Sequence, residues 1–356
     1  MDSFGIGYSL DAYKFGDKGA DTLGNIVKYR NSKNMILNLP NLAKRGLQIA
    51  AEDSRGSKFS RNIFSGSSVK IEGKYGYCVE QSIGKDTLTG HWEIAGVITK
   101  FNWYYFTKKN NTGSYFPKEI LQQLSEKSIV QGFIDAGYSS GINAINNYGK
   151  IHCNTLKPII YTSKDSVLQI AADEDTFGLD KLYMVCRTAR QLFDEKNIKL
   201  GRVIARPFKK VKEKYIRTNN RKDYSILPIE KTLLNILEEA GVQVVGIGKI
   251  SDIFANKGIT RSVKVSGIKK LFDETINVYK ASEANTFIFT NFSDFDSHFG
   301  HRRDIEGYAN SLEYFDSRLS ELDEILDADT IVIVTKIMDA TPAGLVLIIL
   351  ESIFLF

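Results

Sequence analysis

The densest group of side chains that could do chemistry lies in residues 294–304, which read DFDSHFGHRRD. They follow residues 286–292, an aromatic and β-branched stretch that predicts a buried strand. In an open α/β sheet, ligands gather beyond the carboxyl ends of the strands, and carboxylates with imidazoles suit a divalent transition metal. The sequence therefore indicates a metal site here, with an ordinary polar loop of ion pairs as the alternative.

A second group lies in residues 84–93, GKDTLTGHWE, where glycines flank a hydroxyl-rich turn that also carries a lysine and an aspartate. A threonine hydroxyl held against metal ions can lose its proton and attack phosphorus. A turn with a capping threonine explains the same residues, and from composition alone this simpler interpretation is favoured.

Alternating strand-like and helix-like stretches predict the elements that hold these groups. A helix is expected over residues 228–240, with Pro228 at its start and Gly241 as its stop. A second helix is expected from the apolar positions 312, 315, 319, 322 and 326. Short apolar strands are expected at residues 158–161, 202–205, 242–247, 286–292 and 330–334, the last of the kind found in parallel sheets. This order of strands and helices predicts a doubly wound α/β core sheet.

Residues 101–225 differ from the rest, with more polar and aromatic loops and strands of their own. We expect them to form an inserted α+β domain, so that residues 1–100 and 226–356 together make the core. The chain has 356 residues, 43% hydrophobic and 25% charged, which is enough for one large domain or two linked ones.

The composition favours a protein of the reducing cytosol. Three cysteines, an odd number at no metal-like spacing, argue against a disulfide framework, and the opening residues show no signal peptide. The long apolar run at residues 344–356 is too short to span a membrane and contains Glu351. The basic stretch at residues 206–222 is either a solvated face or a phosphate-handling surface. A nucleic-acid stripe is least favoured, because Glu213 and Asp223 interrupt the positive charge.

These segments together resemble one family. Phosphopentomutases are similar to this chain, in the same order, at residues 2–7 (DSFGIG), 19–24 (GADTLG), 84–96, 161–172 (YTSKDSVLQIAA), 201–208 (GRVIARPF), 246–253 and 294–304. The resemblance covers nearly the whole chain and is weakest over residues 97–156. It implies membership of the alkaline-phosphatase superfamily, with a metal-bearing α/β core and an inserted cap domain.

The resemblance also implies an activity and a site. Such an enzyme is an isomerase that moves phosphate between C1 and C5 of ribose or deoxyribose, through a phosphothreonine, a bisphosphate intermediate and two manganese ions. Arginines suit the sugar-phosphate site because a planar guanidinium pairs with two phosphate oxygens. The matching residues are Asp2, Asp296 and His301 for the metal, Thr87 for the phosphate carrier, and Ser163, Asp165, Arg202 and Arg217 for the sugar phosphate.

Both ends of the chain depart from the family's pattern. Met1 stands where the family has a first strand, which would leave the sheet with unpaired backbone groups. Minor differences are Asp173 in place of histidine and Asn219 in place of proline. After residues 330–334 the family has an Asp-His-Gly turn and a Thr-Asp-His-Thr-Arg-Glu segment that supply its remaining metal ligands, and neither follows Thr335 here.

The genetic code suggests a cause for the divergent C-terminal end. Possible codons for Lys336 onward, read one base earlier, can encode the missing strings, so we expect a one-base frameshift near Thr335 and Lys336. Residues 336–356 would then be an out-of-frame tail that was never selected to pack, and this particular chain would be impaired or inactive. A genuine terminal strand or helix is the alternative.

Two other functions stay open. One is a related metal-dependent phosphatase or phosphoglycerate mutase, against which the ribose-type strings at residues 162–172 and 201–208 argue. The other is a non-catalytic pseudogene product, which the missing ligands favour. The main expectation is a cytoplasmic enzyme of nucleoside catabolism that acts on a small sugar phosphate, with no nucleic-acid or membrane partner.

Overall fold

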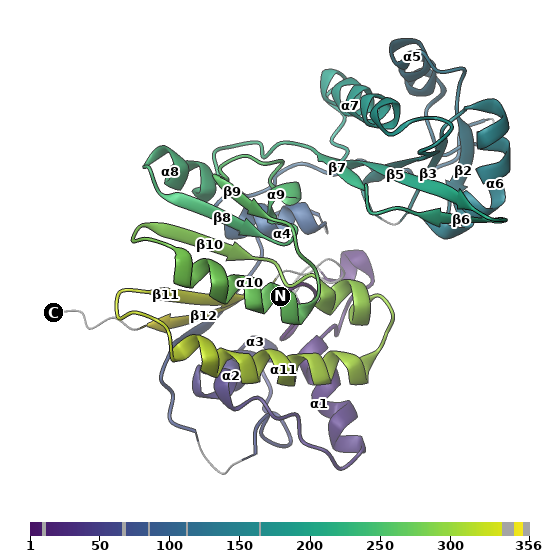
Figure 1. The fold of residues 1–356 in the computed structure, drawn as a ribbon. Coiled ribbons are helices and arrows are strands. Elements are labelled where there is room, and N and C mark those ends of the chain that lie inside the picture. Colours follow the sequence, from purple (N-terminus) through teal and green to yellow (C-terminus); the bar gives the residue numbers. More distant parts are fainter. Residues whose placement is uncertain are drawn as a thin grey trace. The chain divides into compact units, whose positions relative to one another are not determined.

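The computed structural model describes residues 1–8, 12–65, 69–84, 86–111, 113–163, 165–336 and 345–351. The chain divides into two compact units (Figure 1): unit 1 is Met1–Thr99 with Ile229–Phe356, and unit 2 is Lys100–Pro228. Unit 2 is therefore inserted between the two segments of unit 1. Within the described residues, no helix is both long and apolar enough to cross a membrane.

In the described part of unit 1, six strands form two sheets of three. In the first sheet, β8 (Gln243–Ile247) lies between β10 (Thr286–Thr290) and β9 (Arg261–Val263), and all three run parallel. The second sheet is antiparallel, with β12 (Leu345–Glu351) between β1 (Lys74–Cys78) and β11 (Ile331–Thr335). The α/β core predicted from the sequence is confirmed, and its strands are both parallel and antiparallel.

The first residues of the chain contact both of these sheets. The Met1 ammonium group donates to the Thr335 carbonyl at the end of β11, at 2.9 Å. The Asp2 N–H donates to the Phe292 carbonyl just after β10, at 3.4 Å. Asp2 is therefore fixed at the carboxyl end of β10, where an α/β sheet gathers its ligands.

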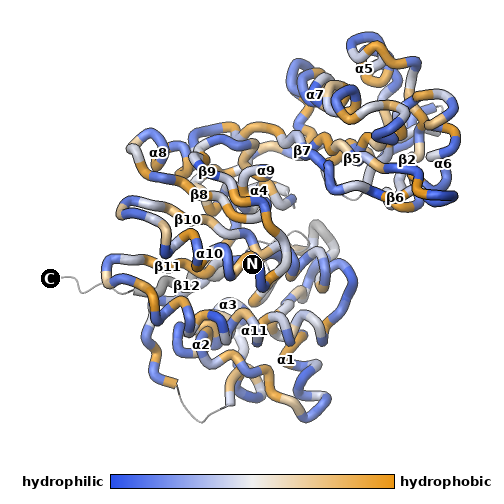
Figure 2. Tube along the Cα trace, in the orientation of Figure 1, coloured by the Kyte–Doolittle hydropathy of each residue, from blue (hydrophilic) through white to orange (hydrophobic). Residues whose placement is uncertain are grey.

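The helices of unit 1 share a hydrophobic core with these strands. In α11 (Ile305–Asp323) the predicted positions Leu312, Phe315, Leu319 and Leu322 are all buried, as helical spacing requires. Figure 2 shows hydrophobic residues along the strands of unit 1 and a mixture of hydrophobic and hydrophilic residues along its helices. The other helices are η1 (Ala12–Phe15), α1 (Thr22–Ser32), α2 (Pro40–Lys44), α3 (Leu47–Arg55), α4 (Thr87–Ile94), α8 (Leu233–Glu239), α9 (Ile250–Ile253), α10 (Ile268–Ala281) and the π-helix η2 (Phe295–Gly300).

Unit 2 is built on one mixed sheet. Its strands pair in the order β2-β3-β4-β5-β6, with β7 also on β5. Along β4, Leu168, Ile170 and Ala172 pack in one hydrophobic cluster with α7, while Ala171 packs in another with α6, so helices cover both faces. The elements are α5 (Lys118–Ser128), β2 (Ile134–Tyr138), α6 (Gly141–Thr155), β3 (Ile159–Thr162), β4 (Val167–Asp173), α7 (Leu179–Glu195), β5 (Arg202–Val211), β6 (Lys214–Arg217) and β7 (Lys222–Ser225).

The five strands predicted from apolar runs are confirmed as β3, β5, β8, β10 and β11, with shifted ends. The helix predicted over residues 228–240 is correct in type but wrong at its start. Thr232 caps α8 by accepting the Asn235 N–H, and Asn235 accepts the Thr232 N–H in return, so this capping box rather than Pro228 begins the helix.

Two expectations about the C-terminal segment are wrong. The strand at residues 330–334 was expected in a parallel sheet, but β11 pairs antiparallel with β12. The tail was expected not to pack, yet Leu345–Glu351 forms β12 between β1 and β11, which is the terminal-strand alternative. The frameshift itself concerns the gene and stays a prediction; residues 337–344 and 352–356 lie outside the described chain.

Candidate active site

Thr87 is the first residue of α4, and its neighbours explain why the helix begins there. The Asp86 carboxylate accepts the Leu88 N–H at 3.0 Å and caps the helix. One turn later, His91 Nδ1 lies 2.8 Å from the Thr87 carbonyl oxygen. Thr87 is 9% exposed and lies at a helix N-terminus, where free N–H groups and the helix dipole favour an anion such as phosphate.

Asp2 is buried and held on both sides. Asn291, which follows β10, donates its side-chain N–H to Asp2 Oδ1 at 2.7 Å. The Tyr308 hydroxyl donates to the Asp2 carbonyl at 3.3 Å and lies 3.4 Å from the Ser3 hydroxyl. Asp2 is only 2% exposed, with Asn291 bonded to its carboxylate and Tyr308 to its backbone.

Asp296 and His301 pair with each other. Asp296 lies in η2, is 6% exposed, and its Oδ2 is 2.9 Å from His301 Nε2. Gly300 makes the close packing possible here, since a Cβ at this position would lie 3.0 Å from both Asp296 Oδ1 and the Ser3 hydroxyl. The π-helix therefore brings Asp296 against the segment that carries Asp2.

The three predicted metal ligands have the right chemistry but not the right number. Carboxylate oxygens and an imidazole suit Mn²⁺ or a similar divalent ion. In the part of the chain that the structure describes, however, no three His, Cys, Asp or Glu side chains lie close enough together to hold a metal ion. Asp2, Asp296 and His301 alone therefore do not make a complete metal site.

A buried lysine directly follows strand β11, where the resemblance placed further ligands. Lys336 is 1% exposed, and burial lowers the pKa of its ammonium group to about 7, although the charges of Asp21 and Glu80 act in the opposite direction. In its charged form this ammonium group has no lone pair with which to bind a metal ion. The sequence indicated that ligands were missing after Thr335 but did not indicate this buried charge.

The four predicted sugar-phosphate residues all lie in unit 2. Arg202 Nη2 and Asp165 Oδ2 are 3.7 Å apart. This ion pair connects the two family-like segments at residues 161–172 and 201–208. Arg217 ends β6, and its guanidinium packs with the Tyr161 hydroxyl against Gly141, where a Cβ would collide with both. Ser163 directly follows β3 and is half-buried.

Two further arginines join this cluster in unit 2. Burial and the charge of Arg221 lower the pKa of Arg206 to about 10, and the charges of Tyr161 and Arg217 also act on Arg206. Arg221 forms an ion pair with Asp223 at 2.6 Å. The basic stretch thus includes an arginine cluster in which Arg206 is partly buried and Arg217 and Arg221 are exposed, while the exposed Lys210 and its neighbours fit a solvated face. Arginines so arranged suit a phosphate group.

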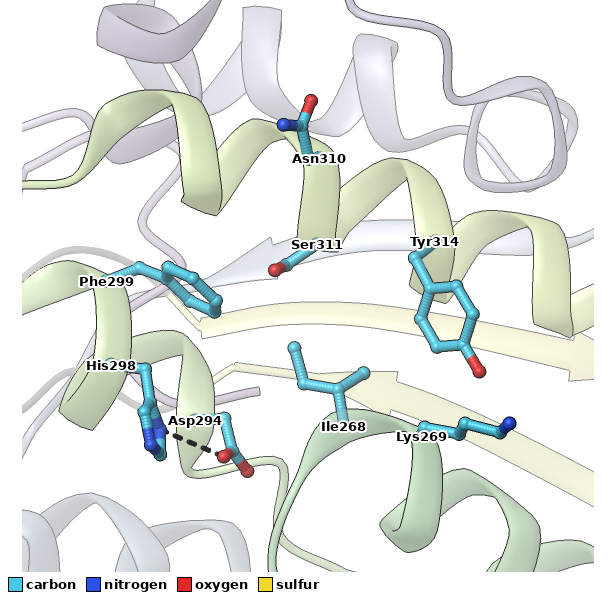
Figure 3. A pocket seen from close by; sticks show the side chains of 8 residues that line it. All are labelled: Ile268, Lys269, Asp294, His298, Phe299, Asn310, Ser311 and Tyr314. Atoms are coloured by element: carbon cyan, nitrogen blue, oxygen red, sulfur yellow. Dashed lines mark ion pairs between the residues drawn. The ribbon is translucent and has the colours of Figure 1, made fainter.

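Unit 1 also contains a pocket of about 370 Å³ beside η2 (Figure 3). The His298 and Asp294 side chains pair across its edge, with His298 Nδ1 3.0 Å from Asp294 Oδ1. Asp294 also accepts the Gly267 N–H at 3.2 Å. Asp294 and His298 belong to the predicted group at residues 294–304, but none of the residues matched to the family's metal, phosphate or sugar site lines this pocket, whose lining is Ile268, Lys269, Asp294, His298, Phe299, Asn310, Ser311 and Tyr314.

The fold and these side chains define a class of protein. A family model described as the Metalloenzyme superfamily matches residues 1–336, nearly the entire chain, so the chain belongs to this superfamily. Its relatives narrow the class. A phosphopentomutase of Aeromonas salmonicida is 50% identical over 340 residues, which cover 94% of this chain and 83% of the relative. The phosphopentomutase of Aeromonas hydrophila is 49% identical with the same coverage, and that of Shewanella baltica is 48% identical over 342 residues. The chain is a member of the phosphopentomutase family.

The side chains that connect the predicted site residues were not themselves predicted from the sequence. His91 was part of the quoted segment at residues 84–93, but no role was predicted for it. Asn291 and Tyr308 were not singled out, and both contact Asp2. Two signals in the sequence could have identified them. His91 is a histidine among apolar neighbours, and Asn291 is a polar residue at the end of an apolar strand.

Proposed function

We propose that this chain has the site of a phosphopentomutase, which interconverts ribose or deoxyribose 1-phosphate and 5-phosphate, but with a reduced capacity for catalysis. The observation that carries the proposal is the hydrogen-bonded connection from Thr87, at the start of α4, to Asp2 at the end of β10. These residues come from different parts of the sequence and match the phosphate carrier and a metal ligand of the family.

In the proposed reaction, phosphate on the Thr87 hydroxyl is transferred to the free hydroxyl at one end of the sugar phosphate. Thr87 then takes the phosphate from the other end of the resulting bisphosphate. Each transfer forms one P–O bond and breaks another, so phosphothreonine is regenerated after every cycle. The N-terminus of α4 would stabilise the negative charge on the transferred group.

Unit 2 would serve as the cap that binds the sugar phosphate. Ser163, Asp165, Arg202 and Arg217 are the proposed binding residues, since they combine hydrogen-bond acceptors for sugar hydroxyls with guanidinium groups for phosphate. The ion pair between Arg202 and Asp165 would orient the guanidinium in the absence of substrate. Exclusion of water by such a cap favours transfer between sugars over hydrolysis.

The reduced capacity follows from the metal donors. The family would use manganese, with Asp2, Asp296 and His301 as ligands, and the remaining family ligands are absent after Thr335. The described residues do not complete a metal site. We therefore expect slow phosphate transfer from this chain in the cytoplasm, where nucleoside catabolism would supply its substrate.

The proposal is tested by the phosphorylation of Thr87. The protein is incubated with ribose 1,5-bisphosphate and Mn²⁺, and the peptide that contains Thr87 is analysed by mass spectrometry. Phosphate is expected on Thr87, absent in Thr87→Ala and retained in Thr89→Ala, a buried threonine of the same helix. Phosphate that appears on another residue, or none on Thr87, contradicts the proposal.

The alternative enzyme class is distinguished by substrate. A phosphoglycerate mutase would turn over phosphoglycerate, and a phosphatase would release inorganic phosphate. The arginine cluster of unit 2 and the relatives favour the sugar phosphate. Conversion of phosphoglycerate that exceeds conversion of ribose 1-phosphate would overturn the assignment.

A further inference from the structure

Two arginines of unit 2 carry positive charge that no ion pair balances. Their neighbour Arg221 pairs with Asp223 through two hydrogen bonds of 2.7 and 2.6 Å. Among the residues that the structure describes, however, no carboxylate lies within ion-pair distance of Arg206 or Arg217. Because a charge that is partly removed from water without a partner is costly, these two guanidinium groups favour a ligand of opposite charge.

Both arginines lie on the face of the sheet that α6 covers. Arg206 pairs with Ala171 of β4, and Arg217 pairs with Phe208 of β5. Directly paired residues of neighbouring strands point to the same face. Ala171 and Phe208 pack in one hydrophobic cluster with residues of α6, which identifies this face. Arg206 is half-buried and Arg217 is exposed, so a ligand can reach both from the solvent.

Neighbouring residues hold each of the two guanidinium groups in place. Arg206 Nε donates to Gln169 Oε1 at 3.0 Å, which leaves both terminal nitrogens of Arg206 for a ligand. The Arg217 guanidinium lies beside the Tyr161 hydroxyl at the N-terminus of α6, where Gly141 is the first residue. A Cβ on Gly141 would collide with both groups, so the glycine leaves room for the Arg217 guanidinium.

The polar groups that surround this position leave donors without acceptors. Guanidinium groups can only donate, and a helix offers no acceptor to its own first N–H groups. Tyr161 is 0% exposed, and its hydroxyl hydrogen has no acceptor among the described residues. Burial and the charge of Arg221 lower the pKa of Arg206 to about 10, and the charge of Arg217 acts in the same direction. An anion with several acceptor oxygens, such as a phosphate dianion, satisfies these donors and offsets the repulsion between the arginines.

We propose that Arg206 and Arg217 form a phosphate-binding site within unit 2, and that Gly141 is a positioning residue that keeps the Arg217 guanidinium at the N-terminus of α6. The site takes a phosphate dianion, which the proposed function supplies as the phosphate group of the sugar phosphate that is not being transferred. Arg202 lies four residues before Arg206, on the same face of β5, and is paired with Asp165. The charge of Arg202 already has a partner, so the phosphate is assigned to Arg206 and Arg217.

Isothermal titration calorimetry of the full chain tests the site, with ribose 5-phosphate as the ligand and no added Mn²⁺. The wild type should bind, and Arg206→Gln should bind about tenfold more weakly because a charge-assisted hydrogen bond is lost. Arg206→Lys should lie between the two, since it keeps the charge without the planar fork. Arg187→Gln is the matched control. It makes the same change in α7, which packs on the other face of the sheet, and should bind like the wild type.

Gly141→Ala tests the position of Arg217 without removing any charge. The added Cβ must displace the end of the Arg217 side chain, while alanine favours the helix, so the variant should fold and yet bind ribose 5-phosphate about tenfold more weakly. Ile142→Ala changes the next position of α6, which is 59% exposed, and should leave binding unchanged. Inorganic phosphate is the second ligand. It should bind more weakly than ribose 5-phosphate to the wild type, and Arg206→Gln should weaken the binding of both.

The inference fails if the wild type does not bind ribose 5-phosphate, or if Arg206→Gln binds it as well as Arg187→Gln does. Equal binding by Gly141→Ala and Ile142→Ala would overturn the role of Gly141. Inorganic phosphate that binds as tightly as ribose 5-phosphate would assign the site to free phosphate and overturn its role with the sugar phosphate. The identity of the ligand rests on the proposed function, but the two fail separately. An unphosphorylated Thr87 would remove the proposed function without changing these affinities, whereas equal affinities would remove the site and leave the phosphorylation of Thr87 as it is.

Discussion

The Asp86 and His91 side chains fix the position of Thr87 through hydrogen bonds at the first turn of α4. Polar side chains next to a helix N-terminus satisfy N–H and C=O groups that the helix leaves free, and they thereby determine where it begins. Asp2 is different, because its partners Asn291 and Tyr308 come from distant parts of the chain. Thr87 is therefore positioned by residues close to it in the sequence, whereas Asp2 is positioned by tertiary contacts.

The burial of His91 makes unit 1 sensitive to acid. Its pKa is lowered to about 4 in the folded protein, whereas an unfolded chain has the usual value of 6.5. Because the unfolded state binds the proton more readily, this contribution to stability is complete above pH 6.5 and is lost as the pH falls toward 4. The loss should reach about 3 kcal/mol in the free energy of unfolding.

Urea unfolding at pH 7.5 and pH 4 measures this effect. His91→Gln should show a smaller loss on acidification than the wild type, because glutamine does not titrate in this range. His298→Gln removes a half-exposed histidine and serves as the control. Equal pH dependence in wild type and His91→Gln would contradict this account of His91.

Lys336 is expected to destabilise the protein at neutral pH. Its pKa falls to about 7 on folding from the usual 10.5, so the folded state disfavours the charged form. The cost is complete below pH 7 and disappears as the pH rises to 10.5, with a size of up to about 5 kcal/mol. Lys336→Met should therefore raise the free energy of unfolding at pH 7 and below, and have little effect above pH 10.5.

Denaturant titrations over this pH range test the prediction for Lys336. Lys264→Met, at an exposed lysine, is the control and should change stability little. A Lys336→Met protein that is less stable than the wild type at pH 6 would show that the ammonium group is favourably paired.

At the scale of the elements, α2 illustrates how distant helices hold one another. Its N-cap residue Leu39 has no side chain that can accept a hydrogen bond. Asp316 of α11 takes this role and accepts the N–H groups of Asn41 at 3.1 Å and Leu42 at 2.7 Å. This cap comes from a residue more than 270 positions away, so the end of α2 depends on the docking of α11.

Asp316→Ala should therefore lower the free energy of unfolding by about 2 kcal/mol, since two buried N–H groups lose their acceptor. Chemical denaturation measures the change, with Glu324→Ala at the exposed end of α11 as the control. Equal stability of the two variants would show that water or another group replaces the Asp316 carboxylate.

The sequence predicted elements better than it predicted their pairing. Apolar runs located β8, β10 and β11 because a buried strand requires them wherever it lies. The start of α8 was missed because Pro228 was chosen over the capping box of Thr232. The position of β12 could not be predicted, because the out-of-frame interpretation assumed that residues beyond Thr335 do not pack, and only tertiary contacts place Leu345–Glu351 between β1 and β11.

The sequence predicted which residues belong to the candidate site, but not the hydrogen bonds that connect them. Thr87, Asp2, Asp296 and His301 were identified through resemblance, and their neighbours in the sequence gave the helix and strand ends that carry them. The link between His91 and Asn291 spans 200 residues and needs the folded chain. The mutual pairing of Asp296 and His301 likewise depends on the π-helix, which no sequence pattern indicated.

At the scale of the whole molecule, the proposed reduction in activity depends on the C-terminal end of the chain. The family model matches residues 1–336 and ends at the buried Lys336. Lys336 is also the first residue of the segment that the predicted frameshift would place out of frame. The nucleotide sequence, read in the neighbouring frame, would test this directly through the presence or absence of the Asp-His-Gly and Thr-Asp-His-Thr-Arg-Glu strings.

The measurement that tests the central claim most directly is the Mn²⁺ content of the purified chain after equilibration with excess Mn²⁺ and gel filtration. An incomplete site of Asp2, Asp296 and His301 predicts no ion retained on the column and only weak binding in solution, which Asp296→Asn should weaken further. Two Mn²⁺ ions retained per chain, or binding that Asp296→Asn leaves unchanged, would contradict the account and show that other residues complete the metal site.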